Sequence, residues 1–248
     1  MLKLDLSRRQ FVNVSLASLG LYGITGLPNF VLADEPSDFD EVTRFLRTGK
    51  SHIPYITLTE EGPVYPTAEI PWLGDFTSVG GQGKRPAGQL VYLFGRILDA
   101  KGRPLPETVV EIWQADTQGH YKHPKWPGQE GLDPNFGYFG KVKSAQDGTY
   151  LFKTIIPSLY RILGITRAPH IHLKMMHPDH GSLTTQVYFE GEQDDQLREK
   201  DPVWQGIPRV TRDHLILTKQ SPTKFADLNI ALEQDAVCCK CDLAFLLG

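Results

Sequence analysis

The stretch that decides the fold is YRILGITRAPHIHLKMM, residues 160–176. Pro169 restricts the residue before it to an extended backbone, and the residues after it are branched or apolar without a helical period, so we expect a β-strand here. Side chains at positions i and i+2 of a strand point to the same face. His170 and His172 can therefore bind one metal ion together. The alternative for a His-x-His pair is a half-exposed strand with two solvated or core histidines.

Three other residues favour the metal. Arg167 comes three residues before His170, Tyr160 comes ten before it, and Tyr121 lies further upstream. A tyrosine, with a pKa of about 10, becomes an anionic ligand only beside a strong Lewis acid. Taken singly, a loop tyrosine such as Tyr121 is most often packed or solvent-exposed, and Tyr160 reads as a hydrogen-bonded core residue.

Two tyrosines and two histidines together indicate ferric iron. Phenolate and imidazole are hard-to-intermediate donors, whereas zinc and copper sites of the soft type use thiolates. Fe(III) with two phenolates and one hydroxide is neutral, which a desolvated site tolerates. We therefore expect a ferric iron cofactor.

Length and composition limit the class of protein. The chain has 248 residues, of which 40% are hydrophobic and 22% charged, with 23 glycines and 18 prolines. This is typical of one globular domain that is rich in turns and long enough to bury a core. The net charge of −3 comes from scattered charges, so no basic face for nucleic acid or an anionic membrane is visible. We expect no nucleic-acid partner.

Residues 1–33 have the pattern of an export signal. Residues 7–12, SRRQFV, form a twin-arginine pattern, and an apolar run with glycine and serine interruptions continues to Ala33. The alternative is a transmembrane anchor, but these interruptions make a poor lipid-spanning helix. We expect cleavage after Ala33, export by the twin-arginine route to the periplasm or beyond, and no stable membrane anchor. Residues 34–248 would form the catalytic domain.

The fold class that this domain predicts is all-β. We expect an antiparallel β-sandwich core over about residues 89–248, with long connecting loops and a few short helices. The expected strands, separated by turns rich in glycine and proline, are residues 89–98, 107–115, 140–144, 150–153, 170–176, 183–189, 210–217, 225–232 and 241–247.

Two hairpins are expected among these strands. Residues 89–98 should pair with residues 107–115, and a second hairpin should turn at Asp147-Gly148. Before the core, residues 42–49 can form one short helix. Residues 57–66 form a turn-rich arm that either covers a sheet edge or lines a pocket.

The connection at residues 116–139 is expected to be functional, because long loops without secondary structure are uncommon inside compact domains. It carries Tyr121, flanked by His120 and His123. We expect these two histidines to be solvated, with orientation of a substrate as the alternative.

Several motifs, taken in order, carry a resemblance to a known family. They are GRILD at 95–99, IWQAD at 112–116, Tyr121, DPNFG at 133–137, Tyr160, RAPHIH at 167–172 and QVYFEG at 186–191. With this set the chain resembles the intradiol ring-cleavage dioxygenases, closest to the protocatechuate 3,4-dioxygenase type. The resemblance covers the core and, more weakly, its flanks.

The resemblance implies four ligands of non-haem Fe(III). Tyr121 and His170 would be equatorial, and Tyr160 and His172 axial. Arg167 matches the arginine beside the reacting ring, with a surface salt bridge as its alternative role.

Other positions match the family less closely. Gln186 matches a position near the iron. An arm that lines the substrate pocket in this family matches Gly62, Pro63 and Tyr65 more loosely. Ile162 stands where an aromatic residue often follows the axial tyrosine, and the loop from Tyr160 to His170 is short. The substrate could therefore differ from protocatechuate.

The activity that the resemblance implies is insertion of O2 into a catechol-type, protocatechuate-like diol. The ring would open between its two hydroxyl-bearing carbons to a cis,cis-muconate-type product. The catechol would displace hydroxide and the Tyr160 phenolate, which accept its protons as general bases. Arg167 would stabilise developing negative charge. The expected partners are this substrate and O2, and the chain could be part of an oligomer.

Two questions stay open at this point. Residues 95–160 also resemble transthyretin-like sandwich modules that bind without catalysis, and iron content distinguishes the two. Cys238, Cys239 and Cys241 cannot complete a four-ligand zinc site, because the sequence has no second cysteine pair. Their odd number leaves at least one free or intermolecular thiol in an exported protein.

Overall fold

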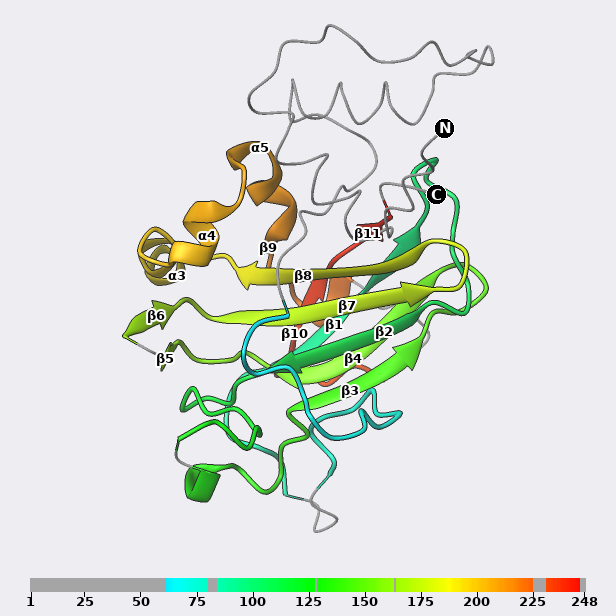
Figure 1. Ribbon diagram of the computed structural model, residues 1–248. Helices are drawn as coiled ribbons and strands as arrows, with labels where there is room; N and C mark the ends of the chain where they lie inside the picture. Colours follow the sequence, from blue (N-terminus) through cyan, green and yellow to red (C-terminus); the bar gives the residue numbers. More distant parts are fainter. Residues whose placement is uncertain (1–60, 80–83, 128, 163, 225–230, 246–248) are drawn as a thin grey trace, which may run out of the picture. The chain divides into compact units, whose positions relative to one another are not determined.

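The computed structural model describes residues 61–79, 84–127, 129–162, 164–224 and 231–245 (Figure 1). All of them belong to one compact unit, residues 38–248. The expected export signal at residues 1–33 and the expected helix at residues 42–49 lie outside the described residues.

One sheet carries the strand with the two histidines. Its order is β3 (Phe139–Lys143), β2 (Val109–Gln114), β7 (His170–His177), β8 (Gly181–Phe189) and β9 (Ile216–Leu217). The first four strands are antiparallel to their neighbours, and β9 adds parallel to β8. β7 is the middle strand, so both of its edges are hydrogen-bonded and its side chains are fixed on two faces.

The second sheet is built around β1 (Leu90–Leu98). β4 (Thr149–Ile155) pairs antiparallel with β1, while β10 (Val237–Lys240) and then β11 (Leu243–Ala244) pair parallel with it. Gly95 lies where β10 gives way to β11. A Cβ at that position would overlap the carbonyl oxygen of Cys241, so the close approach of these two segments of the chain requires glycine.

The main hydrophobic core lies between these two sheets, which form the two layers visible in Figure 1. Ile112 and Leu173 from the first sheet share this core with Leu93 and Phe152 from the second, and all four are fully buried. Side chains alternate along a strand, so the intervening residues of β2 and β7 face the other side of the first sheet. The predicted all-β sandwich is confirmed.

A second buried cluster lies on that other side. It consists of Val64, Trp113, Ala115, Tyr121, Trp126 and Tyr160. Two short strands, β5 (Tyr160–Ile162) and β6 (Ile165–Arg167), form a small hairpin beside it. These two strands are not among those expected from the sequence, because three-residue strands show too little periodicity to be recognised.

The helices are short. They are α3 (Glu192–Arg198), α4 (Pro202–Gly206) and α5 (Arg209–Arg212), with 3-10 turns η1 (Gln129–Gly131) and η2 (Asp213–Leu215). Among the described residues, none of these elements has the length and apolar character that crossing a membrane requires.

The two expected hairpins are wrong in their pairing. β1 pairs with β4, not with β2, and β3 pairs with β2, not with β4. The chain does turn at Asp147-Gly148, where Thr149 donates to Asp147, but this turn carries it from one sheet to the other. Each strand thereby buries one face in the core between the two sheets. Sequence periodicity can indicate which face of a strand is buried, but not which strand it pairs with.

The expected strand at residues 210–217 is also wrong. Pro208 is the N-cap residue of α5, and its carbonyl oxygen accepts from the Thr211 hydroxyl. The strand β9 consists only of Ile216 and Leu217. A short apolar run does not distinguish a strand from a helical turn.

The C-terminal expectations are partly wrong. In place of one strand at residues 241–247, two strands, β10 and β11, are present, and β10 begins earlier. Most of the expected strand at residues 225–232 lies outside the described residues, and its last two residues are not in a strand.

Candidate active site

The two histidines of β7 lie on the same face, as the strand alternation predicts. Both are buried, with 1% of each exposed, and the His170 Nε2 atom lies 3.1 Å from the His172 Nε2 atom. Their partners across the sheet are Tyr188 and Gln186 of β8. One face of the sheet therefore brings two imidazole nitrogens to a single point.

Hydrogen bonding fixes the tautomer of His170. Its Nδ1 lies 2.6 Å from the carbonyl oxygen of Ala168. A carbonyl oxygen only accepts, so Nδ1 carries the proton and Nε2 keeps its lone pair. The Nδ1 atom of His172 is buried without a hydrogen-bond partner among the described residues.

Both rings are held in the neutral form. Burial holds the pKa of His170 well below its usual range, and the positive charge of Arg167 adds to this. Burial likewise lowers the pKa of His172, with further contributions from His170 and Arg167. Neutral imidazole is the form that binds a metal.

The two predicted tyrosines meet beside these rings. Their ring centroids are 5.0 Å apart, and the Tyr160 centroid lies 5.5 Å from that of His170. Tyr121 Oη is buried and makes no well-aligned hydrogen bond to the described residues. Burial raises the pKa of both phenols, although Arg167 opposes this effect at Tyr160. An added cation is needed to ionise them at neutral pH.

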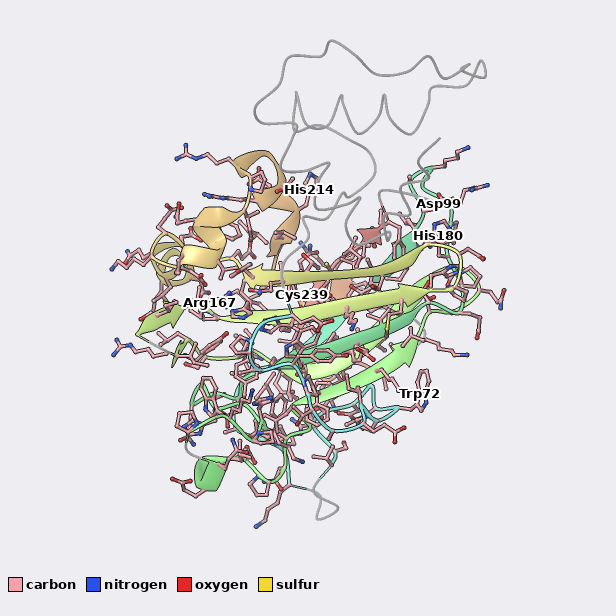
Figure 2. All side chains as sticks on the ribbon, in the orientation of Figure 1. Trp72, Asp99, Arg167, His180, His214 and Cys239 are labelled. Carbon is pink, nitrogen blue, oxygen red and sulfur yellow. The ribbon has the colours of Figure 1, made fainter. Side chains whose placement is uncertain are left out.

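Arg167 lies at the end of β6, close to the start of β7 (Figure 2). Its side chain is buried, so the alternative of a surface salt bridge is wrong. Nη1 donates to Tyr160 Oη at 3.2 Å, and Nη2 donates to Gln186 Oε1 at 2.5 Å and to Tyr188 Oη at 3.4 Å. The guanidinium therefore joins the tyrosine to the predicted glutamine.

Two residues of this network were missed by the sequence analysis. Tyr188 follows Gln186 by two residues on β8, so strand alternation could have identified it. Asp201, which binds Arg167 Nε, precedes Pro202 and has the pattern of a helix N-cap. The sequence analysis could not predict this contact, because Asp201 lies 34 residues after Arg167 in the chain.

The loop at residues 116–139 is anchored at its two ends. Asp116 accepts from the backbone N–H groups of Gln118 and His120 and from Tyr138 Oη at 2.8 Å. Gly119 has a φ of 80°, and a Cβ there would overlap the carbonyl oxygen of Leu159. This close approach places the segment before Tyr121 directly against the residue before Tyr160.

The flanking histidines differ from each other. His120 is half-buried, with Nδ1 3.2 Å from the Gly131 carbonyl oxygen. His123 is buried, and burial lowers its pKa, followed by the charge of Lys125. The expectation of a solvated side chain is wrong for His123, because the loop folds over it.

Trp113 and the described part of the arm at residues 57–66 pack against the His172 ring. The indole stacks on the His172 ring at 4.7 Å and 8°. A Cβ on Gly62 would lie 3.8 Å from His172 Cε1, so the arm passes close to the imidazole. Tyr65 packs edge-on against Trp113 at 4.9 Å and donates to Glu111 at 2.8 Å. Pro63 is exposed.

A cavity of about 400 Å³ adjoins the site. Its lining includes Gln118, Gly119, His120, Trp126, Tyr160 and Arg161. A larger depression of about 710 Å³ lies along Glu190, Arg198 and Lys219 and contains none of the predicted site residues. Of the two, the smaller cavity is the one whose lining includes a predicted site residue, Tyr160.

The residues present fit a ferric ion. Among the described residues, no group of three or more His, Cys, Asp or Glu side chains is arranged to hold a metal. Two neutral imidazoles converge beside the buried Tyr121 phenol, which has no hydrogen-bond partner within the described part of the chain. Buried polar groups without partners are rare, and an ion would satisfy them.

Comparison with known proteins identifies the family. A family described as Dioxygenase matches residues 61–237, more than half of the chain. The beta chain of protocatechuate 3,4-dioxygenase from Burkholderia cepacia is 37% identical over 159 residues, which cover 62% of this chain and 66% of that one. The chain belongs to the intradiol dioxygenases.

A second curated intradiol dioxygenase is also similar. The catechol 1,2-dioxygenase of Acinetobacter baylyi is 33% identical over 148 residues, which cover 54% of this chain and 46% of that protein. The chain thus spans less than two thirds of the length of either relative.

Among solved structures, the fold is shared with catechol 1,2-dioxygenase from Acinetobacter sp. ADP1 inhibited by bound mercury. The TM-score is 0.59 at 24% identity, covering 84% of this chain and 67% of that one.

Proposed function

We propose that this protein cleaves the ring of a catechol-type diol between its two hydroxyl-bearing carbons, with O2 as co-substrate. The observation that carries the proposal is the meeting of Tyr121, Tyr160, His170 and His172 at one buried point, in a chain of the intradiol dioxygenase family. The iron cofactor, the roles of the residues and the substrate are all part of this proposal.

Those four side chains would hold Fe(III). When bound, the ion supplies Lewis-acid binding of both catechol oxygens and makes the ring reactive toward O2. His170 supports this role through its fixed tautomer, since its Nε2 lone pair is available. Trp113 supports it by stacking on His172, which restricts rotation of that ring.

The chain's own groups move the proton and stabilise charge. Tyr160 Oη would accept a proton from a substrate hydroxyl, and Arg167 Nη1, which donates to it at 3.2 Å, would orient it. The permanent charge of Arg167 stabilises negative charge that develops on the ring. Gln186 accepts from Arg167 Nη2 and so keeps the guanidinium plane turned toward the site.

The substrate class follows from the relatives' names. Protocatechuate, catechol and 6-chlorohydroxyquinol are named as substrates of proteins similar to this chain. We propose a single-ring 1,2-diol. Because relatives are named as alpha and beta chains, we also propose that this chain assembles with other subunits.

The cellular location is a separate proposal. The twin-arginine pattern at residues 7–12 supports export, which would suit a protein that folds around its cofactor before it crosses a membrane. Replacing Arg8 and Arg9 with lysine should leave the folded protein in the cytoplasm. Unchanged export of the double variant would contradict this route.

The experiment that tests the activity combines a metal analysis with a ring-opening assay over a panel of catechols. We expect about one iron per chain, visible colour from phenolate-to-iron charge transfer, and muconate-type products. A colourless, iron-free protein that binds a catechol without consuming it would instead favour the transthyretin-like binding module. No comparison supports that alternative.

A further inference from the structure

Asp201 forms the second half of a buried ion pair with Arg167. The residue is fully buried, and both of its carboxylate oxygens lie 3.0 Å from Arg167 Nε. Its partner is the arginine to which the proposed function assigns charge stabilisation. Burying a carboxylate is costly unless several donors satisfy it, so the other contacts of Asp201 show what holds it in place.

The carboxylate is fixed from behind by helix α4. Asp201 is the N-cap residue of this helix and accepts from the backbone N–H of Val203 at 2.9 Å and of Trp204 at 3.3 Å. These bonds set the side-chain conformation independently of Arg167. The helix terminus therefore presents an already oriented carboxylate to the arginine.

The same carboxylate is linked to a proposed iron ligand. Ala168 donates its backbone N–H to Asp201 Oδ2 at 3.0 Å, and the Ala168 carbonyl oxygen accepts from His170 Nδ1 at 2.6 Å. Ala168 thus connects Asp201 to His170, the histidine whose tautomer is fixed by the Ala168 carbonyl oxygen. Outer partners of this kind orient metal-binding histidines.

We propose that Asp201 is a positioning residue that orients the Arg167 guanidinium and, through the Ala168 backbone, the His170 ring. Because Asp201 holds Nε, the two terminal nitrogens have one arrangement, with Nη1 on Tyr160 and Nη2 on Gln186. This inference rests on the proposed function, because Arg167 and His170 matter to catalysis only if that function is correct.

The first test replaces Asp201 with asparagine, which keeps the shape and can still cap α4 but removes the charge. A displacement of about 1 Å at a catalytic group can cost roughly 10²-fold in rate. We expect a fall of about that size in kcat/KM for ring opening. In the Arg167→Met background, Asp201→Asn should cause no further fall, because coupled residues are not additive.

The matched control is Asp99→Asn. Asp99 is another buried aspartate that binds an arginine Nε, at 2.6 Å from Arg103, and it accepts two backbone N–H groups. Figure 2 shows it at the opposite end of the sheets from Arg167. We expect this variant to lose stability with unchanged kcat/KM. An equal loss of activity in both variants would overturn the positioning role.

A second measurement is made on the metal-free protein and needs no turnover. The Arg167 Nε–H proton should exchange slowly with solvent in an NMR spectrum of the wild type and rapidly in Asp201→Asn. If the wild type opens no catechol but this exchange difference is present, the proposed function fails while the Asp201 contact stands. If ring opening occurs and the exchange is unchanged, the inference fails alone.

A third variant covers the case in which Asp201→Asn does not fold. Asp201→Glu keeps the charge and shifts it by one methylene, so we expect a folded protein with a smaller loss of kcat/KM than Arg167→Met shows. Wild-type kcat/KM in the glutamate variant, or independent and multiplicative losses with Arg167→Met, would contradict the proposal.

Discussion

The two tyrosines at the site differ in what holds their hydroxyl groups. Tyr160 Oη accepts from Arg167, while Tyr121 Oη has no well-aligned partner among the described residues. An ion would satisfy Tyr121, whereas Arg167 already gives the Tyr160 hydroxyl a partner that does not depend on an ion. This asymmetry supports the expected roles of Tyr121 as a permanent ligand and of Tyr160 as the ligand that leaves.

Single substitutions should separate these roles. Tyr160→Phe should keep iron and most of the visible colour but turn over about 10²–10⁴-fold more slowly, because a positioned proton acceptor is gone. Tyr121→Phe should instead lose iron and absorbance. Metal analysis and visible spectra of both variants provide the measurement, and equal iron loss in the two would contradict the assignment.

The local sequence pattern predicted some of the individual site residues. Strand alternation was enough to place His170 and His172 on one face. It could not show that Arg167 is buried, because its partner Asp201 comes from a helix 34 residues later. Contacts between distant segments depend on how the sheet and helices pack, which no local pattern records.

At the scale of elements, the 116–139 loop is held by a buried tyrosine with an uncommon backbone. Tyr138 has a φ of 62°, and its hydroxyl donates to Asp116 and accepts from the Asp133 N–H at 2.7 Å. These bonds close the loop that carries Tyr121. Left-handed backbone in a bulky residue persists only where its surroundings enforce it.

Tyr138→Phe should therefore weaken both the fold and the metal site. We expect a loss of roughly 1–3 kcal/mol in the free energy of unfolding, since a buried carboxylate loses a donor, together with lower iron affinity. The control is Tyr150→Phe, which removes the bond from Tyr150 Oη to the Cys241 carbonyl oxygen in the second sheet. Its iron affinity should be unchanged; a loss of iron in both variants would count against the loop argument.

The cysteines of the second sheet are free and buried. Burial raises the pKa of Cys239 to about 12 and that of Cys241 to about 12, and it also raises the pKa of Cys238. Thiolates are the reactive form, so a thiol reagent should modify none of the three in the native protein and all three after unfolding. Rapid labelling of the native protein would contradict this burial.

Strand positions were easier to predict than strand partners. The runs at residues 89–98 and 107–115 contain β1 and β2, but the expected hairpin paired them with each other. Both strands are buried along most of their length, and the turn that follows β1 would also allow a hairpin. In the folded protein, β1 and β2 lie in different sheets of the sandwich. They pack across the shared core and do not hydrogen-bond to each other.

For the whole molecule, acid stability depends in part on Asp99. Burial by itself raises the pKa of this carboxyl, but hydrogen bonds from Arg103 and Lys101 outweigh burial and hold the pKa below its usual range. The folded state therefore binds a proton less readily than the unfolded state. The stabilisation is complete above about pH 4 and is lost as the pH falls through the lower, folded-state pKa.

Asp99→Asn should lower the free energy of unfolding by roughly 1–3 kcal/mol at pH 7, and its difference from the wild type should shrink below about pH 4. Denaturant unfolding at several pH values measures this. Asp179→Asn, an exposed turn residue, is the control and should follow the wild type. A difference that grows as the pH falls would have the wrong sign.

The central claim is that this chain opens aromatic diols between their hydroxyl-bearing carbons. The most direct measurement is mass spectrometry of the product formed from catechol and protocatechuate under isotopically labelled O2. We predict a cis,cis-muconate-type diacid that carries one labelled oxygen in each new carboxylate. A product cleaved outside the two hydroxyls, or unchanged catechol beside an iron-loaded protein, would contradict the account.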